Sequence, residues 1–233
     1  MTGTALITGT DTGLGRLLLN TFLVHGYRVF AGRYRENTRY DDSRSIGEDS
    51  LIIVPLDVSD SDSVEAAGRS VESMTDSLDI IINNAGIDTE RPDAPLEQLQ
   101  IEEVLRVLDV NSAGPLRITQ RFLPLLRRGR GKLLINITSD TVRLTDCAYK
   151  SKFGYYMSKA AVNIQSRILQ NYLGEEGIKI LAIYPGWMQT DLGGANADIP
   201  PIESARGIYE LSQQNWDVSD HIFITYTGKP VSW

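Results

Sequence analysis

The chain has 233 residues, of which 42% are hydrophobic and 23% are charged, as is ordinary for a soluble globular protein. This length fits one domain with a substantial buried core, so we expect residues 1–233 to form a single domain. The net charge of −7 argues against nucleic acid as a partner, because a phosphate-binding surface needs clustered lysine and arginine. The one such cluster, at residues 127–132, follows a helical stretch, where cations oppose the helix dipole.

The scarcity of cysteine and histidine excludes several kinds of site. Cys147 is the only cysteine, so neither an intrachain disulfide nor a cysteine-based metal site can form, and we expect no metal. A catalytic cysteine would need His25 or His221 as its base; the first precedes a probable helix end and the second opens an apolar strand. No run of about eighteen apolar residues and no leader-like segment are present, so we expect a cytoplasmic protein without a membrane partner.

Short apolar runs alternate with longer segments of helical period, which is typical of a parallel sheet covered by helices on both faces. The predicted strands are Thr4–Thr8, Arg28–Arg33, Leu51–Leu56, Ile80–Asn83, Lys132–Thr138, Lys179–Tyr184 and His221–Thr225. The predicted helices are 14–25, 61–76, 97–126, 153–174 and 203–213, while the polar stretch 36–50 predicts a loop or a short frayed helix. The pattern predicts an α/β fold: a single doubly wound Rossmann-like domain with a seven-stranded parallel sheet flanked by helices.

A glycine-rich turn directly follows the first predicted strand and opens the first predicted helix. It runs from Thr8 to Gly15, with glycines at positions 9, 13 and 15. Glycines let the backbone approach a pyrophosphate closely, and the helix N-terminus offers free N–H groups and the positive end of its dipole. This placement predicts a dinucleotide site.

A candidate acid–base pair lies in the helix predicted over 153–174. Tyr155 and Lys159 are four residues apart and therefore share one helix face, while Ser139 ends the fifth predicted strand. A hydride that arrives at a carbonyl carbon leaves an alkoxide, which must be protonated. Free tyrosine titrates near pH 10, so we expect the Lys159 ammonium to lower the pKa of Tyr155 and to make it usable as acid or base.

Asn111 is the fourth candidate catalytic residue. A helical N–H at position 115 would bond to the carbonyl of Asn111, but Pro115 has no N–H and kinks the helix. The carbonyl of Asn111 is thereby left free to hold a water that relays protons to Lys159. The alternative is that Gly114-Pro115 merely bends a long helix.

The glycine spacing of this turn resembles that of the classical short-chain dehydrogenase/reductase family, and further motifs follow in the family's order along almost the whole chain. The resemblance implies that Asp57 contacts adenine, that residues 83–86 (Asn-Asn-Ala-Gly) form a turn at the cofactor, and that Thr190 approaches the nicotinamide. It gives the catalytic roles to Ser139, Tyr155, Lys159 and Asn111. The expected cofactor-binding residues are Gly9, Asp11, Thr12, Gly13, Leu14, Gly15, Arg33, Asp57, Val58, Asn83, Ala85, Gly86, Tyr155, Lys159, Pro185, Gly186 and Thr190. One departure is the interval from Ser139 to Tyr155, which is longer than is usual in the family.

Charge at the end of the second strand indicates the cofactor. NAD-preferring relatives place an acidic residue there, which holds the ribose 2′-hydroxyl and repels a 2′-phosphate. This chain has Arg33 at that position, and a guanidinium suits a phosphate monoester. We therefore expect NADP(H) rather than NAD(H).

These inferences predict an NADP(H)-dependent oxidoreductase that transfers hydride between nicotinamide and a carbonyl or secondary alcohol. The partner is a small-molecule substrate, bound by residues 140–154 and 187–202. Two alternatives remain: a non-catalytic NADP-binding regulator or signalling protein on the same fold, and a non-redox lyase or epimerase. The resemblance also implies a homodimer or homotetramer.

Overall fold

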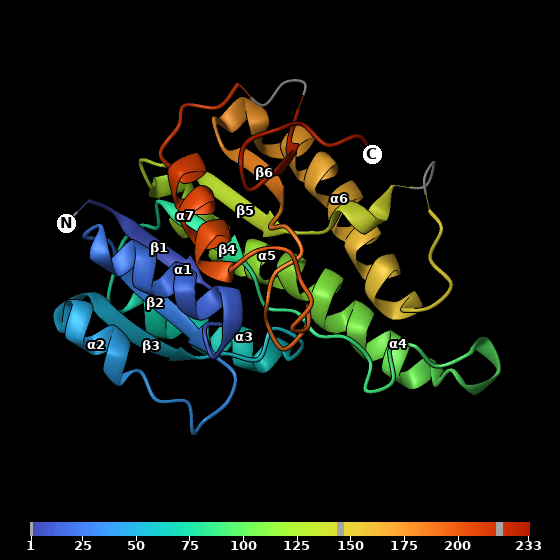
Figure 1. Ribbon diagram of the computed structural model, residues 1–233. Coiled ribbons are helices and arrows are strands. Elements are labelled where there is room, and N and C mark those ends of the chain that lie inside the picture. Colours follow the sequence, from blue (N-terminus) through green and yellow to red (C-terminus); the bar gives the residue numbers. More distant parts are fainter. Residues whose placement is uncertain (1, 144–146, 218–220) are drawn as a thin grey trace.

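The central element is a parallel sheet of seven strands in the order β3-β2-β1-β4-β5-β6-β7 (Figure 1). This computed structural model describes residues 2–143, 147–217 and 221–233. Most strand residues are buried and apolar without alternation, because helices cover both faces of the sheet. The strands of the described residues are β1 (Thr4–Ile7), β2 (Arg28–Arg33), β3 (Leu51–Pro55), β4 (Ile80–Asn83), β5 (Leu133–Ile137), β6 (Lys179–Tyr184) and β7 (Phe223–Thr225). The predicted doubly wound sheet is confirmed.

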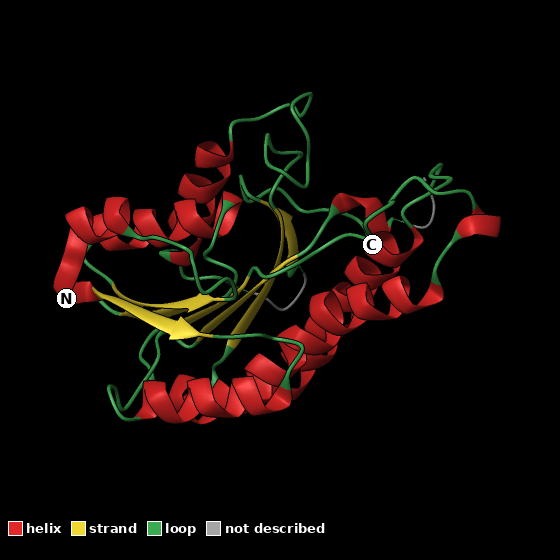
Figure 2. Ribbon diagram, turned by 90° about the horizontal axis from the view of Figure 1, so that it is seen from below, coloured by secondary structure: helices red, strands yellow, loops and turns green. Residues whose placement is uncertain are grey.

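Helices form a layer on each side of the sheet (Figure 2). One apolar core lies beneath α1 and α7, and the other beneath α3, α5 and α6. The helices are α1 (Gly13–Val24), α2 (Asp41–Gly47), α3 (Ser61–Glu72), α4 (Ile101–Leu108), α5 (Gly114–Arg128), α6 (Phe153–Leu173) and α7 (Pro201–Ser212). The short α2 agrees with the short helix considered for residues 36–50.

The helix predicted over 97–126 is present as consecutive helical turns from Ile101 to Arg128, and it is irregular near the expected kink at Pro115. The structure has α4, then a π-helical turn over Asp109–Ala113, and then α5. The physical reason lies at Pro115, which cannot donate the backbone hydrogen bond that an uninterrupted α-helix requires. The π-helical turn therefore contains Asn111, the residue predicted to take part in the proton relay.

The strand order reverses direction at β1, which pairs with β2 on one side and with β4 on the other. In open parallel sheets, ligands bind outside the carboxyl ends of the strands at such a switch point. The glycine turn follows β1, the turn 83–86 follows β4, and Ser139 follows β5 by two residues. The topology thus brings most of the predicted site residues to one edge of the sheet.

Candidate active site

The glycine turn is bonded directly to the turn after β4. Thr8 Oγ1 accepts hydrogen bonds from the backbone N–H groups of Asn84 and Ala85, both at 3.0 Å. The side-chain amide of Asn84 donates to the carbonyls of Thr8 and Gly9 at 3.0 and 3.1 Å. Gly9 has a φ of +67°, and a Cβ added there would lie 2.8 Å from the Cα of Ala85. Only glycine fits this close approach, and Asn84, which was absent from the predicted site, is one of the residues that hold it.

The start of α1 is open to a ligand. The Thr12 side chain makes no capping hydrogen bond, so the first N–H groups of the helix remain available to an anion. A Cβ on Gly15 would overlap the carbonyl oxygen of Gly9, so this position also requires glycine. A Cβ on Gly13 would lie 3.6 Å from Thr190 Cγ2, so the loop after β6 reaches the glycine turn. The side chain of Leu14 is buried in the core, which leaves only its backbone for the cofactor.

Asp11 binds the loop that follows β2. Its carboxylate accepts hydrogen bonds from Tyr34 N at 3.0 Å, Arg35 N at 2.9 Å and Thr38 Oγ1 at 2.7 Å. These bonds fix the chain immediately after Arg33, the last residue of β2. Among the described residues, the Arg33 guanidinium forms no ion pair with an acidic side chain, so its charge is free for a ligand.

Two other predicted cofactor residues are occupied by contacts within the protein. The Asn83 amide is buried and donates to Asn136 Oδ1 at 2.8 Å, which joins β4 to β5. Asp57 Oδ1 accepts from the backbone N–H and the hydroxyl of Ser59 at 2.9 and 2.6 Å, just before α3. The side chain of Val58 is buried. Asn83 and Val58 therefore offer a ligand mainly their backbone.

The loop after β6 begins with Pro185-Gly186. Pro185 is buried, and Gly186 has a φ of +84°, a left-handed conformation that favours glycine. A Cβ on Gly186 would also lie 2.6 Å from Ile199 Cδ1. This turn directs the chain toward Thr190 and back over the glycine turn.

Tyr155, Lys159 and Asn111 lie together beside the turn after β4. Lys159 Nζ lies 5.7 Å from the centre of the Tyr155 ring. A Cβ added to Gly86 would lie 3.7 Å from Lys159 Nζ and 3.4 Å from Asn111 Oδ1. Gly86 therefore lies close to both the Lys159 ammonium and the Asn111 side-chain amide.

Asn111 is held on both sides of its amide. Its Oδ1 accepts from Ile87 N at 2.8 Å, and its Nδ2 donates to Ile87 O at 2.9 Å and to Ser158 Oγ at 3.0 Å. The Ser158 hydroxyl in turn donates to the carbonyl of Tyr155 at 2.7 Å. The side chain of Asn111 is therefore structural, and only its backbone carbonyl remains for the predicted relay.

Ser139 lies at the expected strand end, but its hydroxyl is bonded locally. It shares a hydrogen bond of 2.8 Å with Thr141 Oγ1 and accepts one of 3.3 Å from Thr141 N. This side chain caps the short 3₁₀ turn over Asp140–Val142. Among the hydrogen bonds of the described residues, none joins Ser139 to Tyr155. Residues 144–146, in the segment that lengthens the Ser139–Tyr155 interval, lie outside the described residues.

The expected lowering of the Tyr155 pKa by Lys159 is wrong for this structure. Burial raises the pKa of Tyr155 above its usual value, and the carboxylates of Asp88 and Asp140 raise it further. Burial also lowers the pKa of Lys159 to about 8. The sequence indicates which groups are neighbours but not how deeply they are buried, and here desolvation is the largest cause of both pKa shifts.

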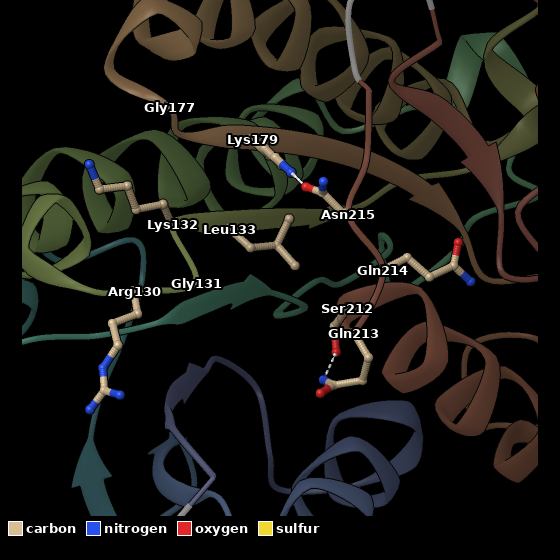
Figure 3. A pocket seen from close by; sticks show the side chains of 10 residues that line it. All are labelled: Arg130, Gly131, Lys132, Leu133, Gly177, Lys179, Ser212, Gln213, Gln214 and Asn215. Atoms are coloured by element: carbon tan, nitrogen blue, oxygen red, sulfur yellow. Dashed lines mark hydrogen bonds between the residues drawn. The ribbon is translucent and has the colours of Figure 1, made fainter.

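A cavity of about 350 Å³ lies at the opposite edge of the sheet (Figure 3). It is lined near the amino ends of β5 and β6, where Lys179 Nζ donates to Asn215 Oδ1 and Gln213 Nε2 donates to Ser212 Oγ. It contains none of the predicted site residues. Within the described ranges, no group of three or more histidine, cysteine, aspartate or glutamate side chains could hold a metal ion. In the same part of the chain, no helix is long and apolar enough to cross a membrane.

A doubly wound sheet with a glycine turn at its switch point and a tyrosine–lysine pair beside it defines a nucleotide-dependent α/β enzyme. The family model described as short chain dehydrogenase matches residues 3–199, so the chain belongs to the short-chain dehydrogenase/reductase family. Membership makes it an oxidoreductase of the class that acts on CH–OH and carbonyl groups.

Similar proteins include C-signal and several retinol dehydrogenases. C-signal of Myxococcus xanthus is 33% identical over 159 residues, which are 68% of this chain and 95% of that protein. Human retinol dehydrogenase 16 is 36% identical over 188 residues, which are 79% of this chain but only 56% of that protein. This chain thus spans little more than half the length of the retinol dehydrogenase.

Two solved structures share the fold along their whole length. The NADPH-bound carbonyl reductase from chicken fatty liver is 29% identical, with a TM-score of 0.88 over 99% of this chain and 98% of the other. Carbonyl reductase Sniffer of D. melanogaster is 24% identical, with a TM-score of 0.89 over all of both chains, and its likeness shows the fold.

Proposed function

We propose that the protein is an NADP(H)-dependent carbonyl reductase that converts an aldehyde or ketone to an alcohol, with Tyr155 as the proton donor. The observation that carries this proposal is the grouping of Tyr155, Lys159 and Asn111 beside the turn after β4. A nicotinamide dinucleotide fits the chain because Gly9 and Gly15 leave no room for side chains and the start of α1 is open. The bound cofactor would supply the hydride.

The protein's own groups handle the proton. A raised pKa keeps the Tyr155 phenol protonated at neutral pH, ready to donate to an alkoxide, which favours the reductive direction. Ser139 would hydrogen-bond the substrate oxygen after its hydroxyl leaves Thr141. Lys159 would reach the nicotinamide ribose and receive protons through water held at the Asn111 carbonyl.

Arg33 supports the choice of NADP(H). It ends β2 beside the loop that Asp11 fixes, and it makes no ion pair among the described residues. A similar structure, the carbonyl reductase from chicken fatty liver, is NADPH-bound. The other predicted cofactor residues, from Gly9 to Thr190, are proposed to bind NADP(H) together with Arg33.

Exposed apolar side chains support a homodimer or homotetramer. Met157, Ile164, Ile168 and Tyr172 are 52–71% exposed and, at spacings of seven and four residues, share one face of α6. Sedimentation would measure the mass, and a monomer would contradict the assembly. A cytoplasmic location is likewise proposed, and fluorescence microscopy of a tagged full chain would test it.

Tyr155→Phe tests the mechanism, with Tyr156→Phe as a matched control that removes the neighbouring phenol. We expect Tyr155→Phe to lower kcat by roughly 10²-fold or more on a panel of aldehydes, ketones and quinones. NADPH affinity, followed by fluorescence, should change little, and Tyr156→Phe should keep most of the activity. Unchanged kcat in Tyr155→Phe would reject the mechanism.

The similarity to C-signal supports a second candidate, a signalling protein on the same fold. A pure NADPH binder would bind the cofactor but oxidise it with no carbonyl of the panel. In that case Tyr155→Phe and the wild type would be indistinguishable in every assay of turnover.

A further inference from the structure

The backbone of helix α5 is irregular where it begins. The π-helical turn over Asp109–Ala113 precedes Gly114-Pro115, and Pro115 has no N–H for the carbonyl of Asn111. The next N–H belongs to Leu116. In an uninterrupted α-helix it would bond to the carbonyl of Ser112, four residues earlier.

The side chain of Gln165 bridges these two groups from the neighbouring helix α6. With its amide oriented to satisfy its surroundings, Nε2 donates to Ser112 O at 3.0 Å and Oε1 accepts from Leu116 N at 3.3 Å. An amide inserted between the donor and acceptor of a helical hydrogen bond is a recognised cause of a kink. Gln165 is half-buried, so water competes weakly for both bonds.

Ser158, one heptad before Gln165 on the same face of α6, binds the same turn. Ser112 Oγ donates to the Ser158 carbonyl at 3.2 Å, and the Asn111 amide donates to Ser158 Oγ at 3.0 Å. Between them on α6 lies Lys159, the lysine of the proposed active site. The contacts therefore join the π turn to the helix that carries the reacting groups.

We propose that Gln165 is a positioning residue for the proton relay: its amide holds the π turn open between Ser112 and Leu116 and so fixes the Asn111 carbonyl relative to Lys159. This inference rests on the proposed function, since it concerns the same relay. It assigns to Gln165 no contact with substrate or cofactor.

Loss of the Gln165 amide leaves the backbone two outcomes. Leu116 N can bond to Ser112 O directly, which restores an α-helical turn and rotates Asn111 about the helix axis by part of a turn. Otherwise both groups stay unpaired, which is unfavourable where they are buried. Either outcome displaces the Asn111 carbonyl or loosens it.

The test compares Gln165→Met, which keeps the side-chain length but has no amide, with Gln165→Glu and with the control Gln120→Met. A carboxylate at 165 can accept from Leu116 N but cannot donate to Ser112 O. Gln120 is exposed on α5 and makes no side-chain hydrogen bond among those of the described residues. The measurements are kcat, the solvent deuterium isotope effect on kcat, its pH profile and the Kd for NADPH.

We expect Gln165→Met to lower kcat about tenfold, to enlarge the solvent isotope effect and to leave the NADPH Kd within twofold, with Gln165→Glu intermediate. If kcat, the solvent isotope effect and the pH profile of Gln165→Met all equal those of the wild type, the proposal is overturned, even if the Tm of the variant is lower. If the wild type and Gln120→Met turn over no carbonyl of the panel, the proposed function fails instead.

Amide hydrogen exchange tests the proposed contact of Gln165 with Leu116 without an activity assay. If Gln165→Met does not fold, the measurement is made on Gln165→Glu. In Gln165→Met the Leu116 N–H should exchange at least tenfold faster than in the wild type if both backbone groups stay unpaired, and measurably more slowly if it bonds to Ser112 O directly. In Gln165→Glu the carboxylate meets the Ser112 carbonyl without a proton to donate, so the Leu116 N–H should again exchange at a rate that differs from that of the wild type. Equal exchange in the wild type and in whichever variant folds would overturn the inference.

Discussion

Lys159 Nζ donates a hydrogen bond of 2.9 Å to the carbonyl of Ile137, the last residue of β5, and the lysine is 5% exposed. The carbonyl replaces only part of the hydration that the ammonium loses, so burial lowers the pKa of Lys159 to about 8. The buried Lys159 ammonium, which the proposed relay requires, thus lowers the stability of the fold.

Lys159→Met should therefore stabilise the protein while it removes activity. Between pH 8 and the usual lysine pKa of about 10.4, the unfolded chain binds more protons than the native state, so wild-type stability rises across this window. At pH 7 the variant should gain up to roughly 3 kcal/mol in the free energy of unfolding, less about 1 kcal/mol for the lost hydrogen bond. Denaturant unfolding at pH 7 and pH 10.5 would measure the gain, and an equal gain at both pH values would contradict the argument.

Asp88 should contribute to the pH dependence of the proposed reaction, after burial, which is the largest cause of the raised pKa of Tyr155. Its carboxylate raises the pKa of Tyr155, together with burial and with Asp140, Tyr156 and Tyr184 around the ring, while Lys152 pairs with Asp88 at 3.8 Å. Asp88→Asn removes one of these negative charges and lowers the Tyr155 pKa. The tyrosinate that alcohol oxidation needs then forms at lower pH.

Profiles of kcat against pH for alcohol oxidation would check this expectation. In Asp88→Asn the rising limb should move to lower pH. Asp93→Asn, in the same loop, is the control, because Asp93 is not among the groups that perturb Tyr155. A shift of equal size in both variants would show a general change in surface charge rather than a specific effect of Asp88.

The strands and the positions of the glycine turn, Ser139 and Tyr155 could be predicted from the sequence, because each depends on local composition and on the order of elements. Apolar runs such as Ile80–Asn83 are buried on both faces, and their spacing identifies a parallel sheet. The carboxyl ends of parallel strands lie at one edge of the sheet, so no further information is needed to place the residues that follow them. Chain order alone thus predicts that the candidate site lies at this edge.

Contacts across the fold could not be predicted in this way. Pro115 indicated a kink, but not the hydrogen bonds that Gln165, fifty positions away on another helix, makes to Ser112 and Leu116 at the π turn. Asn84 and Ser158 were likewise missed, since their partners are distant in sequence or are backbone groups. The pKa of Tyr155 was predicted in the wrong direction because burial is a property of the packed structure.

Arg33→Asp should reverse the cofactor preference. The guanidinium is expected to bind a 2′-phosphate, and hydrogen bonds to charged groups contribute about 1.5–3 kcal/mol, so NADPH affinity should fall roughly tenfold to a hundredfold. An aspartate there can accept from the ribose hydroxyls of NADH. Fluorescence titration with both cofactors gives the ratio of Kd values. A ratio equal to that of the wild type would remove Arg33 from the site, although the enzyme class would stand.

Thr8→Val should separate the glycine turn from the turn after β4. Valine matches the shape of threonine, so no cavity forms, but the N–H groups of Asn84 and Ala85 lose their shared acceptor, Thr8 Oγ1. Two unpaired N–H groups should cost about 2 kcal/mol or more in the free energy of unfolding and weaken NADPH binding, because only the Asn84 side chain then holds Gly9 near Ala85. Thr12→Val, which removes no capping bond, is the control and should change stability by less than about 0.5 kcal/mol. Equal losses in the two variants, measured by denaturant unfolding, would mean that the Thr8 hydroxyl does not join the two turns.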